Sequence, residues 1–473
     1  MNDPLFTTVP PQQKSGKKPG KRKTTHIALQ PRPVNRKIVG GKAIARQINF
    51  SQQRERRANA DKRKQPTVAP TRSLIVSRGT TPSSRKETSK HRSSPSLTAA
   101  LAEKERPTAG TDSSGRRWRP LGPFCIPHGQ TYGFGPGSRP SISGRISAIA
   151  IDPANPDHIL IGSGGGGGIW ETKNNGATWT PRGDDLPSLS IGAMAFSSAD
   201  PSVVYAGTGE GDGTLIDDEN LLGVGFVRST DGGETWTHVT SKPFERSGFY
   251  DLAVDPRNAS HILAATTEGL FRSLDSGISW QRKRRVRTWD LSIHPSSSVN
   301  DALPKEVFAA CVDGLFRSTN GGDSWTKVTL PGNRQHFERM EVCHAPSDAN
   351  VVYVFAATPH SSGSDESPLP HIWRRSVFGG SFSQIDRLPK DLDTEQSWYD
   401  WFADVAPNNP DVLYIGAINA HKGVRSASGS WQWENISAKK FGTSIHPDMH
   451  VIAFSPASPN CIYIGCDGGV FRS

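Results

Sequence analysis

Two imidazoles and a carboxylate alternate in the segment His446-Pro-Asp-Met-His450. Alternating His446, Asp448 and His450 can present these groups to one ligand or metal ion. The alternative is that an imidazole at the entrance of a strand only caps the strand or binds water. We predict that these three residues bind a ligand.

Aromatic rings flank a second carboxylate in the segment Trp398-Tyr-Asp-Trp401. Rings that stack on a sugar, beside an acid that contacts hydroxyl or amine groups, are typical of glycan and peptide sites. Packing between neighbouring elements explains Trp401 better. Tyr399 and Asp400 are predicted to bind ligand, with inter-element packing as the alternative.

A third cluster of oxygen ligands lies in the acidic run from Glu210 to Glu219. Carboxylates of Glu210, Asp212, Asp217 and Asp218 could hold a hard cation such as Ca²⁺. Their spacing matches no EF-hand, and a solvated acidic loop is the competing interpretation. No other pattern in the sequence requires a cofactor.

Repeats in the sequence indicate which elements position these residues. A phrase of the form Ser/Thr-x-Asp/Asn-x-Gly-x-Ser/Thr-Trp occurs four times, and its tryptophans are 57, 44 and 45 residues apart. A second phrase, two apolar strands joined by a turn with Pro or Asn, occurs seven times. Both spacings suit propeller blades. The sequence therefore predicts an all-β fold, a seven-bladed β-propeller of four-stranded blades.

The last copy of the repeat stops at Ser473, before its outer strand. Either the chain is a fragment, or the segment around Trp118, which resembles the phrase that begins at Thr178, supplies that strand. We predict the second. The predicted propeller spans 116–473, with blades at 143–191, 192–247, 248–289, 290–338, 339–390, 398–440 and 449–473, the last closed by 116–122.

The first 115 residues are predicted to be a disordered basic tail. Residues 1–117 hold 27 lysines and arginines against 7 acidic residues, whereas the remainder holds 29 against 38. All 12 tryptophans lie at Trp118 or later, so the tail has too little apolar surface to form a core. A basic tail on an acidic body suggests contact with a polyanion or an acidic membrane surface, or else only a solubilising extension.

The N-terminus provides no recognisable export signal. Residues 1–18 have no apolar core of the signal-peptide type, and no run reaches the roughly 18 apolar residues that span a bilayer. The sequence itself therefore indicates neither export nor a transmembrane segment.

The Trp-containing phrase resembles the Asp-box, or bacterial neuraminidase repeat, of sialidases, xyloglucanase-type glycoside hydrolases, sortilin-type receptors and photosystem assembly factors. The resemblance spans about 118–473 and is strongest to bacterial glycosyl-hydrolase-like repeat proteins. It implies a propeller that is often extracytoplasmic. It also implies that the box residues are structural, on turns away from the central axis. These residues are Asn174, Trp179, Asp231, Trp236, Asp275, Trp280, Asn320 and Trp325.

The same resemblance weighs against some activities. Sialidases use a Phe/Tyr-Arg-Ile-Pro string, where this chain has Cys125 in place of the arginine, so sialidase activity is not expected. Xyloglucanase-type enzymes place an Asp in the first blade, where this chain has only Ser163 and glycines. We therefore expect a binding or scaffolding propeller for a glycan or protein ligand. The alternative is a glycoside hydrolase whose paired carboxylates come from Asp400, Asp404 and Asp448.

Overall fold

A computed structural model describes residues 119–122 and 142–473, with gaps at 213–222, 241, 296–303, 305, 333, 335, 361–366 and 438–444. The predicted basic tail, Trp118, Cys125, Asp217 and Asp218 lie outside the described residues. Within these bounds no helix is long and apolar enough to cross a membrane.

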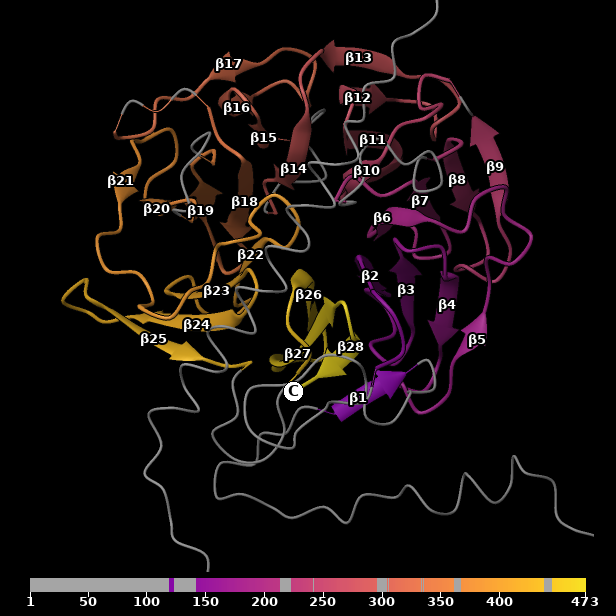
Figure 1. The fold of residues 1–473 in the computed structure, drawn as a ribbon. Helices are drawn as coiled ribbons and strands as arrows, with labels where there is room; N and C mark the ends of the chain where they lie inside the picture. The colour runs from indigo at the N-terminus through magenta and orange to yellow at the C-terminus, as the bar shows by residue number, and fades with distance from the viewer. Residues whose placement is uncertain are drawn as a thin grey trace, which may run out of the picture. The chain divides into compact units, whose positions relative to one another are not determined.

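The described strands form seven four-stranded antiparallel sheets, which surround a central channel as the blades of a propeller (Figure 1). The predicted fold class is thus confirmed. Blade 1 holds β2 (Ala148–Ile151), β3 (Ile159–Ser163), β4 (Gly168–Thr172) and β5 (Thr180–Pro181). Blade 2 holds β6 (Ile191–Phe196), β7 (Val204–Thr208), β8 (Phe226–Ser229) and β9 (Thr237–Thr240). Blade 3 holds β10 (Phe249–Asp255), β11 (Asn258–Thr266), β12 (Gly269–Ser273) and β13 (Gln281–Arg284).

The remaining blades repeat this order from the innermost to the outermost strand. Blade 4 holds β14 (Thr288–Ile293), β15 (Val307–Cys311), β16 (Gly314–Ser318) and β17 (Thr326–Lys327). Blade 5 holds β18 (Arg339–Ala345), β19 (Asp348–Ala357), β20 (Pro370–Arg375) and β21 (Ser383–Gln384). Blade 6 holds β22 (Phe402–Val405), β23 (Val412–Gly416), β24 (Ala420–Arg425) and β25 (Trp431–Asn435). Blade 7 holds β26 (Met449–Ser455), β27 (Ser458–Cys466), β28 (Gly469–Arg472) and β1 (Arg119–Gly122).

The ring is closed by strands from the two ends of the propeller. β1 pairs antiparallel with β28, with Arg119 opposite Arg472 and Pro120 opposite Phe471. The outer strand of blade 7 therefore comes from Arg119–Gly122, at the other end of the propeller from β28. Blade 7 also packs directly against blade 1, through contacts of β2 with β26 and β27.

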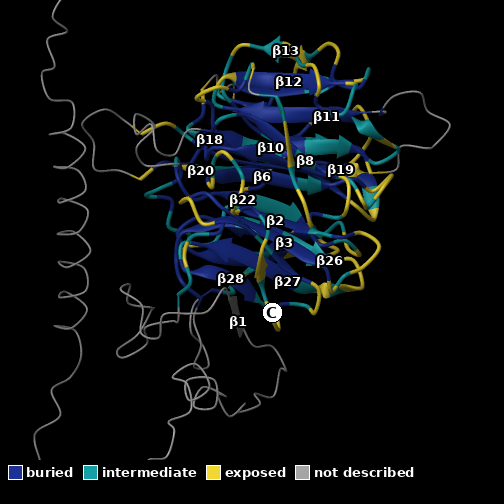
Figure 2. Cartoon of the chain, turned by 90° about the vertical axis from the view of Figure 1, so that its right-hand side faces the viewer, coloured by how far each residue is buried: buried dark blue, intermediate teal, exposed yellow. Residues whose placement is uncertain are grey.

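The hydrophobic core lies between the blades. Seven clusters of buried apolar residues each combine side chains of two neighbouring sheets, because alternate residues of a strand point to opposite faces. Between blades 7 and 1, for example, Tyr463 and Val470 pack against Ile146, Ile159 and Ile161. Buried residues concentrate in the strands, whereas exposed residues lie at the loops (Figure 2).

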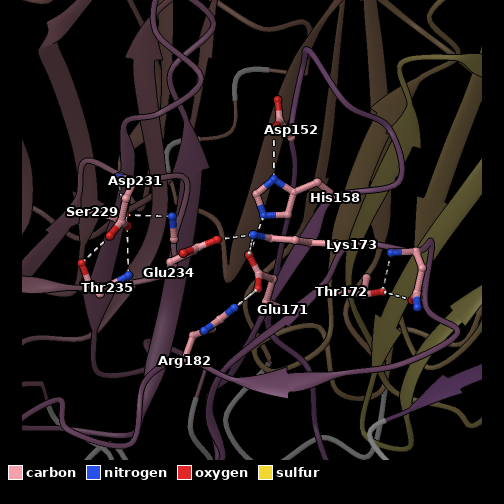
Figure 3. A network of polar contacts seen from close by, with 12 residues as sticks. Asp152, His158, Glu171, Thr172, Lys173, Arg182, Ser229, Asp231, Glu234 and Thr235 are labelled. Carbon is pink, nitrogen blue, oxygen red and sulfur yellow. Dashed lines mark hydrogen bonds and ion pairs between the residues drawn. The ribbon is translucent and has the colours of Figure 1, made fainter.

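The Asp-box phrases form the turns between third and fourth strands. In blade 2 the Asp231 carboxylate accepts hydrogen bonds from Thr235 N–H at 2.9 Å and from Thr235 Oγ1 at 2.5 Å (Figure 3). Ser229 Oγ accepts from Gly233 N–H at 2.8 Å, and the Trp236 indole donates to the Gly233 carbonyl at 3.0 Å. Asn174, Asp275 and Asn320 accept the equivalent backbone bond at 2.9 Å in their own turns. Each box side chain is thus engaged in closing its own turn.

Buried ionic groups also link strands within a blade and between neighbouring blades. His158 bridges Asp152 and Glu171 at 3.0 and 2.9 Å, and Arg182 also binds Glu171 (Figure 3). In blade 4 the fully buried carboxylate of Glu306 receives both terminal nitrogens of Arg375, at 2.8 and 2.6 Å. These side chains have all their partners within the fold, which indicates a structural role.

Candidate ligand-binding site

The strand register places the candidate residues at one end of the channel. Ala148, at the start of β2, lies opposite Gly162, and Ser163 lies opposite Gly168 across the next hairpin. In each blade, the segment before the innermost strand and the turn between the second and third strands therefore lie at the same end of the propeller. We call this end the entrance face. The Asp-box turns join the third and fourth strands and lie at the opposite end.

Five side chains from four consecutive blades form a connected network at the entrance face. Nη1 of Arg145 donates to the Tyr399 hydroxyl at 2.7 Å, and that hydroxyl donates to Oδ1 of Asp467 at 2.6 Å. The other terminal nitrogen of Arg145 pairs with Glu210. Nε2 of His450 lies 2.8 Å from the same Asp467 oxygen, and its ring meets the Tyr399 ring edge to face. We call these five residues the mouth cluster.

The two carboxyl groups of the mouth cluster differ in protonation. Burial raises the pKa of Glu210 to about 7 although Arg145 favours its charged form, and its Oε1 has no partner among the described residues. Burial also opposes charge on Asp467, but hydrogen bonds from His450 and Tyr399 hold its pKa below the usual value. At neutral pH the cluster therefore pairs a partly protonated Glu210 with an ionised Asp467.

The imidazole of His450 is fully enclosed by the blades. Burial disfavours its charged form, but the hydrogen bond to Asp467 outweighs burial and raises the pKa of His450. Nε2 bonds to Asp467, whereas Nδ1 has no partner among the described residues. A buried polar atom without a partner marks a position that a ligand or an ordered water fills.

The other residues predicted from the two motifs lie close to the mouth cluster. Asp400 is 0 % exposed, and neither carboxyl oxygen has a partner among the described residues. Burial, followed by the charges of Asp448 and Asp467, raises the pKa of Asp400 well above its usual value. Asp448 adopts φ 67° and accepts a hydrogen bond from Gln396 at 3.1 Å. Nδ1 of His446 lies 2.8 Å from the carbonyl of Pro447, to which it donates.

Asp404 lies deeper, on β22, and lines a cavity of about 300 Å³ in the central channel. Burial raises its pKa to about 7, and Oδ1 accepts a hydrogen bond from Val405 N–H at 2.7 Å. Asp404 therefore belongs to the wall of the channel, whereas Tyr399 and His450 belong to the mouth cluster.

The four residues predicted to bind Ca²⁺ are only partly described. Glu210 pairs with Arg145, and Asp212 forms an ion pair with the buried Arg339. Asp217 and Asp218 lie outside the described residues. Among the described residues no group of three or more His, Cys, Asp or Glu side chains is arranged to hold a metal ion. Calcium binding by this run stays a prediction.

The aromatic residues of the second motif divide between packing and the entrance face. Trp401 is 1 % exposed, stacks on Phe355 with ring centroids 3.9 Å apart, and donates its indole N–H to the Phe355 carbonyl. Trp398 is half-buried, and its ring lies 5.5 Å from that of Tyr399. Trp398 thus offers an apolar ring beside the mouth cluster.

Arg145 and Asp467 are missing from the residues predicted by motif. Arg145 lies 65 residues before Glu210 and 254 residues before Tyr399, so no local pattern connects them. The positions of these two residues within the repeat could have indicated them. Arg145 immediately precedes an innermost strand, and Asp467 follows a second strand, so both belong to the entrance face of the predicted topology.

Comparisons with known proteins show which fold and which relatives the chain resembles. No protein-family model matches the chain. An oligoxyloglucan-reducing end-specific xyloglucanase of Emericella nidulans is 32 % identical over 130 residues, which are 27 % of this chain and 15 % of that protein. A xyloglucanase of a Paenibacillus species is 27 % identical over 223 residues, which are 38 % of this chain and 20 % of that protein. The chain thus spans a fifth or less of either relative.

The likeness in fold to solved structures rests on a GH74 enzyme. An ancestral GH74 enzyme has a TM-score of 0.54 and 18 % identity, over 74 % of this chain and 46 % of that chain. A structure of YCF48 bound to D1 peptide has a TM-score of 0.46 and 16 % identity, over 70 % of this chain and 93 % of that chain. The protein is therefore a seven-bladed β-propeller similar in fold to GH74 xyloglucanases, and similar to xyloglucanases in part of its sequence.

Proposed function

We propose that the mouth cluster binds a glycan. The observation that carries this proposal is the convergence of a guanidinium, a phenol, an imidazole and two carboxyl groups from four blades at one end of the channel. Sugar hydroxyls both donate and accept hydrogen bonds, and the cluster offers both kinds of group. The half-buried ring of Trp398 provides a face on which a sugar ring can stack.

The partial sequence similarity to xyloglucanases supports a polysaccharide ligand. A protein ligand at the same face is the competing partner. A protein ligand would use the same polar groups, but its binding would not depend on a ring stacked on Trp398. The two are separated by screening the full-length protein on a glycan array that includes xyloglucan oligosaccharides, with isothermal titration calorimetry on every hit.

Two substitutions with matched controls test the site. Tyr399→Phe removes the hydroxyl that joins Arg145 to Asp467, and we expect a loss of about tenfold or more in affinity, since a hydrogen bond to a charged group contributes about 1.5–3 kcal/mol. Trp398→Ala should weaken binding to a similar degree. Tyr414→Phe on β23 and Trp433→Ala on the outer strand β25 should leave affinity unchanged. Equal loss in the controls, or none in the site variants, would overturn the proposal.

Glycosidic bond hydrolysis is a second candidate, favoured by the opposite pKa shifts of Glu210 and Asp467. An inverting hydrolase needs one protonated and one ionised carboxyl group, and here Glu210 would act as the acid and Asp467 as the base. Release of reducing ends from a bound glycan, lost in Glu210→Gln and in Asp467→Asn, would support an enzyme. Loss only in Asp400→Asn, Asp404→Asn or Asp448→Asn would assign the reaction to those carboxylates instead. Binding without release would leave a glycan-binding propeller.

A further inference from the structure

Acidic side chains on four neighbouring innermost strands line the cavity in the central channel. Asp251 on β10, Asp290 on β14, Glu341 on β18 and Asp404 on β22 all contribute to its wall. The cavity measures about 300 Å³. A water molecule takes about 30 Å³ of the liquid, so this space holds a ligand of several heavy atoms.

Two of these carboxyl groups are positioned by a contact that repeats from one blade to the next. Oδ2 of Asp251 accepts a hydrogen bond from Leu291 N–H at 3.1 Å, and Oδ2 of Asp290 accepts one from Val342 N–H at 2.7 Å. Leu291 directly follows Asp290, and Val342 directly follows Glu341. The row is therefore held in place by the fold. Besides burial, Asp290 raises the pKa of Asp251, and Glu341 raises the pKa of Asp290, as neighbouring acidic groups do.

Positive charge is scarce around this row. Among the described residues that line the cavity, Arg339 is the sole arginine or lysine; it pairs with Asp212, and its Nε lies 3.3 Å from Glu341. Neither Asp290 nor Asp404 has a described ion pair with a basic side chain. Accordingly, burial raises the pKa of Glu341 to about 8 and that of Asp404 to about 7.

The remaining titratable groups of the lining do not balance the row. His344 is engaged by Glu306 and Ser292, Cys343 is a buried thiol, and burial raises the pKa of Tyr250 to about 12. His450 also lines the cavity, and its Nδ1 has no partner among the described residues. In its neutral form, with Nε2–H donated to Asp467, this imidazole accepts a hydrogen bond at Nδ1 from an N–H donor in the cavity.

Most of the surface of the cavity is polar, because apolar side chains such as Leu291, Val342 and Ile452 pack in the clusters between the blades. The carboxyl groups are spread along the wall, and the described residues hold no set converging on one point as a metal ion needs. The N–H donors of an elongated cation would meet the carboxylates along the wall. An aliphatic amine has this form.

We propose that the central cavity is a binding site for an aliphatic primary ammonium ion, held by Asp290, Glu341 and Asp404. A free diamine and the lysine side chain of a bound peptide share this chemistry. Binding ionises carboxyl groups that are otherwise protonated, so uptake of the cation is accompanied by release of protons to solvent.

Calorimetry on the full-length protein tests the site, with 1,4-diaminobutane as one probe and a blocked five-residue peptide, Gly-Gly-Lys-Gly-Gly, as the other. Both probes keep their charge between pH 6 and 8.5, because a primary amine titrates near pH 10. We expect tighter binding at pH 8.5 than at pH 6, with proton release measured from buffers of different ionisation enthalpy. Binding of the diamine alone indicates a free amine, and binding of the peptide indicates a protein partner. No binding of either probe at pH 8.5 would overturn the proposal.

Variants locate the binding inside the channel. Asp290→Asn and Asp404→Asn keep the oxygen that accepts from Val342 N–H or Val405 N–H, and each should weaken diamine binding at least tenfold. Asp386→Asn, at an exposed surface position, should not change it. Unchanged affinity in both channel variants, or displacement of the diamine by micromolar Ca²⁺, would contradict an amine site. Infrared difference spectra of the wild-type protein add a test without mutation, since diamine must lower the band of protonated carboxyl groups.

Discussion

The carboxyl group of Glu210 occupies the space beside the α-carbon of Gly164. A β-carbon on Gly164 would lie 2.1 Å from the Glu210 carboxyl carbon, a distance that atoms cannot adopt. Oγ of Ser190 donates to the Gly164 carbonyl at 2.6 Å and fixes the turn in this position. The glycine run after Ser163 thus makes room for a carboxylate from blade 2.

Gly164→Ala is therefore expected to damage the mouth cluster. The added methyl group must displace the buried Glu210 carboxylate and break its pair with Arg145, and overpacking of this kind costs about 1–3 kcal/mol. Chemical denaturation should show that loss, and glycan affinity should fall with it. Gly165→Ala is the matched control, because a β-carbon there meets nothing within 4 Å. Equal stability of the two variants would show that the Glu210 carboxylate does not need this space.

The sequence predicted the propeller well because the same local turn and strand pattern recurs from blade to blade. A turn that closes on its own Asp or Asn, followed by Trp, can be recognised without knowing any distant contact, as in Asp231 and Trp236. The mouth cluster depends on contacts between blades, such as Arg145 with Tyr399, and these arise only when the ring closes. The motif at Trp398 to Trp401 led to Tyr399, but it did not indicate that Asp400 is fully buried.

Stability should fall as the pH rises from about 5 to 8.5. The folded pKa values of Glu341, about 8, and of Glu210 and Asp404, about 7, lie above their unfolded values, so the folded state binds these protons more tightly. Their contribution is complete below the unfolded pKa and is lost as the pH rises through 7 and 8. The loss is about 1.4 kcal/mol for each pH unit that separates the folded from the unfolded pKa. Carboxyl groups whose pKa the fold lowers, such as Asp231 with a pKa of about 2, titrate below this pH range.

Glu341→Gln should remove part of this pH dependence. Urea unfolding at pH 5 and pH 8.5, in buffers free of amines, should show that the variant loses less stability over this range than the wild-type protein. Glu268→Gln, at an exposed turn in blade 3, should behave like wild type. A slope that is the same in all three proteins would mean that Glu341 is ionised in the folded state at both pH values.

The Asp-box side chains are expected to affect stability and not ligand binding. Asp231→Ala removes the acceptor of the two Thr235 hydrogen bonds at the surface, and we expect a cost of about 1 kcal/mol. Affinity for a glycan bound at the entrance face should be unchanged, because the box turn lies at the opposite end of the strands. Denaturation and calorimetry on the same preparation measure both quantities. A fall in affinity without a fall in stability would assign Asp231 to a binding site.

Glu306 should be among the most sensitive positions for stability. Its carboxylate is 0 % exposed and neutralises Arg375, and hydrogen bonds from His344 and Arg375 outweigh burial and lower the pKa of Glu306 to about 2. Glu306→Gln leaves the Arg375 charge buried without its partner, which costs about 3–5 kcal/mol. The stabilisation by Glu306 is present above about pH 4.5 and is lost as the pH falls towards 2, so the variant should lose less stability on acidification.

Glu234→Gln, which breaks the exposed pair with Lys173, should cost less than about 1 kcal/mol. Equal free energies of unfolding for the two variants would show that solvent reaches Glu306.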